Sequence, residues 1–179
     1  MNHPSITVDR AGLWDAEALG DVAAATFPLA VPPQISEAAV AAHIDEALSD
    51  SHFADYLSRP GYTIFKAVSG GDIVGYTLLI DRLPADPEVA RVITPRPALE
   101  VNRMYVLPGH HGTGVSTALM AAAVTTAREA GFATLWLGVN QENERARRFY
   151  AKHGFHTVGT RSFTVGGELC RDDVMLARL

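Results

Sequence analysis

The first sixty residues change from a strand pattern to helical patterns. Apolar and polar residues alternate around Ile6 and Val8, which predicts a first strand. An alanine-rich stretch that follows Asp15 predicts a helix, and Pro28 is expected to end it. Apolar residues recur at helical spacing after Ser36, so a second helix is expected there, followed by a further short helical piece.

The next segment has the pattern of a hairpin followed by an irregular loop. Two apolar runs, at 62–68 and 73–80, flank the turn sequence Ser69-Gly70-Gly71-Asp72, which predicts a β-hairpin. Residues 82–98 contain four prolines. We therefore expect no regular structure there, and a long surface loop that lines a substrate entrance.

Strands and helices alternate in the remainder of the chain. The expected elements are a buried strand at Leu99–Val106, a helix at Ser116–Ala130, a buried strand at 135–139, a polar helix at Asn143–His153, and strands at Phe155–Val165 and Glu168–Leu176. This order predicts an α/β (mixed α+β) fold whose central mixed, mostly antiparallel sheet has about seven strands, with about four helices on both faces. The length of 179 residues and the 47% hydrophobic content fit a single domain over 1–179.

Composition narrows the function classes. A formal charge of −5 and a pI near 5.8 argue against nucleic acid as a partner, and mildly favour a cationic or neutral small substrate. The single cysteine, Cys170, excludes an internal disulfide, and no histidines stand at metal-ligand spacing, so no metal is expected. The chain shows neither a membrane-spanning apolar run nor a signal-peptide pattern at its N-terminus, so we expect a cytoplasmic protein with no membrane partner.

The glycine loop at Gly112-Thr113-Gly114 is the strongest local signal. It joins a buried strand to a helix, so successive backbone N–H groups and the positive end of the helix dipole face one point, where a pyrophosphate fits. A tight turn is the alternative explanation of the two glycines. The loop lacks the Lys-Ser/Thr of a P-loop and the third glycine of a dinucleotide fingerprint.

The neighbourhood of this loop resembles the GNAT superfamily of N-acetyltransferases. His111–Ser116 matches the family signature Gln/Arg-x-x-Gly-x-Gly/Ala, except that His111 and Ser116 replace its first and last residues. Trp136–Val139 and the stretch Ala146–Phe155 are similar to the strand and helix that flank the cofactor in that family. The resemblance covers residues 62–179 well and the first sixty loosely. It is greatest for the PaiA-type polyamine N-acetyltransferases.

This resemblance implies that acetyl-CoA is the acyl donor, and it assigns residues to it. The implied cofactor-binding residues are Met104, Tyr105, Val106, His111, Gly112, Thr113, Gly114, Val115, Ser116 and Asn143, with a backbone N–H near Val106 donating to the acetyl carbonyl. Tyr150 is implied to be the general acid that protonates the leaving thiolate. It follows Asn143 by seven residues, so one helix face presents both side chains. Core packing beside Phe149 is the alternative role for Tyr150.

Glu100 is a candidate general base. It lies eleven residues before His111, a spacing at which some members of the family carry the base. Burial in a strand would push the pKa of such a carboxylate toward neutrality. The alternative is an ion pair with Arg103 or Arg96. Asn102 is two residues further on, shares the sheet face of Glu100 in a regular strand, and is a candidate to orient substrate or water.

The resulting hypothesis is an N-acetyltransferase that moves acetyl from acetyl-CoA to a primary amine, such as a polyamine, by direct attack in a ternary complex. Two alternatives stay open: a catalytically weak acetyl-CoA-binding regulatory module, suggested by His111 and Ser116, and a peptide or protein N-acetyltransferase. The arginines at 145, 147 and 148 either form a solvated helix face or contact cofactor phosphates. A homodimer is the assembly to expect if the chain self-associates.

Overall fold

The strands of the chain form one seven-stranded sheet. The computed structural model describes residues 5–30, 35–47, 50–110, 114–165 and 167–179. The strand order is β1-β2-β3-β4-β5-β7-β6. Every neighbouring pair is antiparallel except β4 and β5, which are parallel. The predicted mixed, mostly antiparallel sheet is therefore confirmed.

The elements follow the predicted order closely. The strands are β1 Ile6–Arg10, β2 Tyr62–Ser69, β3 Asp72–Ile80, β4 Ala98–Val106, β5 Thr134–Asn140, β6 His156–Val165 and β7 Glu168–Arg178. The helices are the 3₁₀ turn η1 Leu13–Asp15, α1 Ala16–Ala30, α2 Glu37–Ala47, α3 Asp50–Ser58, α4 Pro87–Ala90, α5 Val115–Glu129 and α6 Glu144–Lys152. Within the described ranges, no helix combines the length and the apolar character that crossing a membrane requires.

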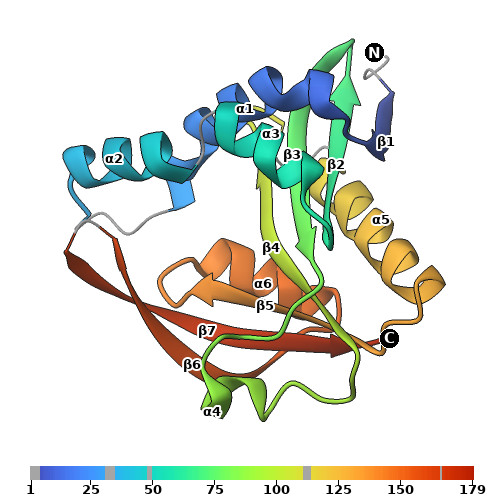
Figure 1. The fold of residues 1–179 in the computed structure, drawn as a ribbon, viewed down its shortest axis with the longest axis vertical. Coiled ribbons are helices and arrows are strands. Elements are labelled where there is room, and N and C mark those ends of the chain that lie inside the picture. Colours follow the sequence, from blue (N-terminus) through green and yellow to red (C-terminus); the bar gives the residue numbers. More distant parts are fainter. Residues whose placement is uncertain (1–4, 31–34, 48–49, 111–113, 166) are drawn as a thin grey trace.

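Helices cover both faces of the sheet (Figure 1). On one face, Leu19 of α1 and Phe53 of α3 pack against Tyr76 and Leu78 of β3. On the opposite face, α5 packs against β4 and β5 through a separate cluster that includes Met120. We call the face that α5 covers the α5 face, and the other the distal face. Apolar residues on alternate strand positions thus bury against helices on both sides.

Two predictions about prolines were wrong. Pro28 lies inside α1, which continues to Ala30. Its missing N–H removes one bond from the last turn only, and the residue is exposed, so the helix tolerates it. The segment 82–98 contains the one-turn helix α4, because Asp86 accepts a hydrogen bond from the N–H of Glu88 at 2.9 Å and Pro87 occupies the first helical position.

Candidate active site

The parallel strands β4 and β5 separate after a short contact. They pair only where Ala98–Glu100 meets Thr134–Trp136, although β4 continues to Val106 and β5 to Asn140. Figure 1 shows the two strands diverging from that point. We call Ala98–Val101 the closed end of β4 and Asn102–Tyr105 its open end. The closed end is buried and the open end is half-buried, because one edge of the strand has lost its neighbour there.

A β-bulge at Asn102 separates the two ends. Leu78 of β3 pairs with Arg103 and Leu79 pairs with Val101, so Asn102 is the additional residue in β4. Glu100 lies on the distal face. In a strand without a bulge, Arg103 is three residues further on and would lie on the opposite face, the α5 face. The bulge instead places it on the distal face, where it meets Tyr56 of α3.

The bulge is followed by a regular ladder that orients backbone N–H groups. Leu107 donates its N–H to the carbonyl of Val74 at 2.8 Å, and the carbonyl of Tyr105 faces Gly75 of β3. In an antiparallel pair the backbone groups of successive residues point to opposite sides. The N–H groups of Met104 and Val106 therefore point away from β3, toward the side on which β5 has diverged.

The glycine loop is partly described. Three of its predicted cofactor-binding residues lie outside the described residues: His111, Gly112 and Thr113. Gly114 precedes α5 with a φ of 89°, a left-handed conformation that favours glycine. Val115 is buried with Val106 in one cluster, and Ser116 is half-buried in the first turn of α5. The N-terminus of α5 thus lies beside the end of β4.

The helix α6 carries the other predicted residues. Asn143 is the N-cap rather than part of the helix, because its Oδ1 accepts a hydrogen bond from the N–H of Ala146 at 3.2 Å. Tyr150 packs among apolar residues, with its ring 5.7 Å from that of Phe155. Burial raises the pKa of Tyr150 above the usual range of a phenol, and nearby Tyr105 adds to the rise. Tyr150 therefore keeps its proton at neutral pH, and lies near the open end of β4.

Glu100 has a partner that the sequence did not reveal. Its side chain is 1% exposed, and its Oε1 accepts a hydrogen bond from Nε of Arg82 at 2.7 Å. The alternative prediction of an ion pair was right in kind but named the wrong partners, Arg103 and Arg96. Arg96 binds backbone carbonyls of its own loop instead. The carbonyl of Arg82 also accepts a hydrogen bond from the indole N–H of Trp136 at 2.8 Å. Glu100 is thus fixed where β4 and β5 begin to separate.

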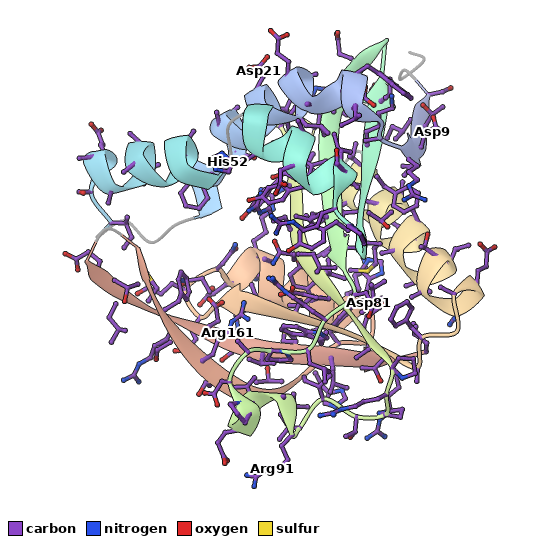
Figure 2. The ribbon with its side chains drawn as sticks, in the orientation of Figure 1. Asp9, Asp21, His52, Asp81, Arg91 and Arg161 are labelled. Atoms are coloured by element: carbon purple, nitrogen blue, oxygen red, sulfur yellow. The ribbon has the colours of Figure 1, made fainter. Side chains whose placement is uncertain are left out.

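A second acid–arginine pair lies on the distal face, and sequence reasoning missed it. Nε of Arg161 binds Oδ2 of Asp172 at 3.2 Å, and its guanidinium lies 5.7 Å from the Trp136 ring centroid. The Arg161 side chain, labelled in Figure 2, passes over Gly138, where any Cβ would collide with it. The only sequence signal was Gly138 in an otherwise bulky strand.

The pKa shifts of Asp172 and Tyr105 show that this ion pair is electrostatically coupled to the open end of β4. Burial raises the pKa of Asp172, with Arg161 opposing the rise and Asp173 adding to it. Burial also raises the pKa of Tyr105, with Arg103 opposing and Asp172 adding. Tyr105 thus senses the charge of Asp172 on β7 and itself acts on Tyr150 of α6. Charges on β4, β7 and α6 are thus electrostatically coupled where β4 and β5 have parted.

One of the α6 arginines has a structural role. Nε of Arg147 binds Oδ2 of Asp173 at 3.0 Å, and its Nη1 donates to the carbonyl of Gln141 at 3.3 Å. The amide of Gln141 donates to the same carboxylate at 3.1 Å. Arg147 therefore connects the start of α6 to β7. This role differs from both predictions for the arginine cluster, a solvated helix face and contact with cofactor phosphates.

Comparison with known proteins identifies the family. The sequence model of the Acetyltransferase (GNAT) family matches residues 29–155. An uncharacterised N-acetyltransferase of Mycobacterium tuberculosis is 44% identical over 167 residues, which cover 93% of this chain and 99% of that protein. The chain therefore belongs to the GNAT acetyltransferase family. The predictions of an N-acetyltransferase and of acetyl-CoA as its acetyl donor are confirmed with it.

Solved structures share the fold across the whole chain. The PaiA N-acetyltransferase of Thermoplasma acidophilum, solved in complex with coenzyme A, has a TM-score of 0.78 at 20% identity, covering 98% of this chain and 99% of that one. The ribosomal-protein-S18-alanine N-acetyltransferase of Escherichia coli has a TM-score of 0.69 at 16% identity, covering 97% and 94%. At these identities the likeness shows the fold alone.

Proposed function

We propose that this chain transfers the acetyl group of acetyl-CoA to a primary amine by direct attack in a ternary complex. The observation that carries the proposal is the separation of β4 from β5, with outward backbone N–H groups on β4 and the protonated Tyr150 nearby. Acetyl-CoA supplies the acetyl group as an activated thioester.

The described residues fit such a donor at several points. The N–H groups of Met104 and Val106 are suited to pair with the amides and the acetyl carbonyl of the donor. The left-handed Gly114 and the N-terminus of the 15-residue helix α5 suit its pyrophosphate. The Oδ1 atom of Asn143 is used as a cap, so its amide nitrogen is the group that would face the donor. The roles of Tyr105, His111, Gly112, Thr113, Val115 and Ser116 remain predictions of the family resemblance.

Each step of the transfer has a proposed residue. As the amine nitrogen bonds to the acetyl carbon, the Val106 N–H stabilises the negative charge that develops on the carbonyl oxygen. As the carbon–sulfur bond breaks, the Tyr150 hydroxyl gives its proton to the thiolate. The proton that the amine loses goes to Glu100 through water, with Asn102 at the bulge orienting the amine or that water.

An acetylation assay tests the proposal. The protein is incubated with acetyl-CoA and a panel of primary amines while the free thiol is followed, and calorimetry measures acetyl-CoA binding in parallel. We expect at least one amine to raise thiol release well above the rate without acceptor. Tight acetyl-CoA binding with no amine-dependent release would instead support the regulatory-module alternative.

A further inference from the structure

Some charged side chains on the distal face have an ion-pair partner, and Arg103 does not have one among the described residues. Glu100 is paired with Arg82, and Asp172 is paired with Arg161. Arg103 lies on the same face, directly after the bulge. The groups of the described residues that act on its charge are phenols: Tyr76, Tyr56 and Tyr105. Among the described side chains, Arg103 therefore has no carboxylate partner, whereas Arg82 and Arg161 each have one.

The surroundings of Arg103 satisfy only part of its guanidinium. Its Nη2 is 3.4 Å from the hydroxyl of Tyr56, and its Cζ lies 5.1 Å from the centroid of that ring. Its Nη1 is buried and, within the described part of the chain, makes no hydrogen bond of good geometry. The Tyr76 hydroxyl, which interacts with the same guanidinium, also lacks one. Burial lowers the pKa of Arg103, but the three phenols outweigh it, so the group stays charged.

Leaving a buried cation without a counter-charge is costly. A guanidinium gives up strong hydration on burial, and aromatic faces restore only part of that loss. A planar fork of N–H donors is suited to bind a carboxylate through two hydrogen bonds. A negatively charged group on a bound ligand would supply the counter-charge that Arg103 lacks in the free protein.

The position of Arg103 relates that anion to the acceptor. The proposed donor contacts include the N-terminus of α5, on the α5 face, so we place the acceptor on the opposite, distal face. Arg103 is half-buried at the open end of β4 and is two residues from Tyr105, which itself acts on Tyr150. Residues two apart in a strand are about 7 Å apart on one face. An anion at Arg103 would therefore lie about two residues along β4 from Tyr105, whose charge acts on Tyr150.

We propose that Arg103 binds a carboxylate of the acceptor, so that the preferred acceptors are amines that also carry a carboxylate. This inference rests on the proposed N-acetyltransferase function. It departs from the polyamine acceptor that the sequence resemblance suggested, since a polyamine would bring further positive charge to an arginine that has no acidic partner among the described residues.

Matched acceptors test the inference with the native protein. The panel contains free amino acids, the same amino acids as carboxamides, the corresponding amines without a carboxyl group, and spermidine. We expect kcat/KM for the best amino acid to exceed that for its carboxamide by about ten-fold to a hundred-fold, the range of a charge-assisted hydrogen bond. Higher kcat/KM for spermidine or for the carboxamides would overturn the inference while leaving the acetyltransferase function intact.

Variants of Arg103 assign the preference to this side chain. Arg103→Gln should lower kcat/KM for the amino acid about ten-fold or more, mainly through KM, and leave the carboxamide within about three-fold. Arg103→Lys keeps the charge without the fork and should restore part of the preference. Arg91→Gln is the matched control, because Arg91 is exposed and pairs with Glu88 on α4, at the edge of the molecule in Figure 2.

Two further results would support or contradict the proposed carboxylate site. An equal loss for amino acid and carboxamide in Arg103→Gln would show a purely structural role and contradict the inference. Calorimetry of an N-acetylated amino acid binding to the protein with CoA gives a readout independent of turnover. Binding that Arg103→Gln weakens supports the carboxylate site. If no amine on the panel is acetylated and no acetylated amino acid binds, both this inference and the proposed function fail.

Discussion

The two ends of β4 belong to one strand, yet they differ in almost every physical respect. At the closed end, β3 and β5 flank the strand, its residues are buried, and Glu100 is fixed by Arg82 beside Trp136. At the open end β5 has diverged, the residues are half-buried, and outward N–H groups lack a strand partner.

Stability and chemistry are therefore assigned to different parts of the same strand. A closed, fully paired strand end contributes packing and satisfied polar groups. An end with one free edge presents backbone donors and polar side chains that a ligand can use. Substitutions of apolar residues at the closed end should therefore act on unfolding, and open-end substitutions on binding and turnover. Glu100, the proposed base, is the closed-end residue whose substitution should also affect turnover.

The largest effect is expected at the closed end. Trp136 is 1% exposed, so Trp136→Ala should lower the free energy of unfolding by about 3–5 kcal/mol, measured by urea denaturation. Trp14→Ala is the matched control, since Trp14 is 82% exposed, and its effect should stay below about 0.5 kcal/mol. Similar losses in both variants would mean that the closed end is not the stabilising region.

The next effect concerns turnover. Tyr150→Phe should lower kcat by about a hundred-fold, because the leaving thiolate loses its proton donor, while acetyl-CoA affinity measured by calorimetry stays within about three-fold. Tyr62→Phe provides the same change on β2, where the hydroxyl accepts a hydrogen bond from the exposed Arg59 at 3.3 Å, and should leave kcat unaltered. Unchanged turnover in Tyr150→Phe would refute the assigned role.

A smaller effect is expected at Gly75, which lies beside the open end of β4 and the start of α5. A Cβ at this position would lie 2.9 Å from the carbonyl oxygen of Tyr105 and 3.2 Å from Cγ1 of Val115. Gly75→Ala should therefore displace β4 and α5, costing about 1–3 kcal/mol of stability and weakening acetyl-CoA binding. Gly159→Ala serves as the control, because a Cβ there would lie 3.8 Å from Cγ2 of Val92, an ordinary van der Waals distance. Equal stability and binding in both variants would contradict this packing argument.

The smallest effect is a pH dependence near the end of α6. Burial lowers the pKa of His153 below its usual value of 6.5, and Lys152 adds to the lowering. The unfolded chain then binds a proton more readily than the folded one, so stability is present above about pH 6.5 and falls as the pH decreases through that value. His153→Gln should reduce the loss of unfolding free energy between about pH 7.5 and 5.5. A loss of the same size in the variant would show that other groups cause it.

The sequence predicted the order of strands and helices well, because apolar periodicity and glycine turns are local signals. It also pointed to Tyr150 and Gly114. It did not predict that Glu100 pairs with Arg82, since ion-pair partners depend on tertiary contacts. Nor did it predict the bulge at Asn102, because one additional residue in a strand leaves no mark on an alternating pattern and yet changes the face on which Arg103 lies.

Amide hydrogen exchange can detect donor binding at the free edge of β4, because it reports on individual backbone N–H groups. If the open end binds the acetyl donor, adding CoA should slow exchange at the N–H groups of Met104 and Val106. The amides of Leu99 and Val101 at the closed end should exchange slowly with or without CoA. Protection elsewhere in the protein with no change at Met104 and Val106 would contradict the account.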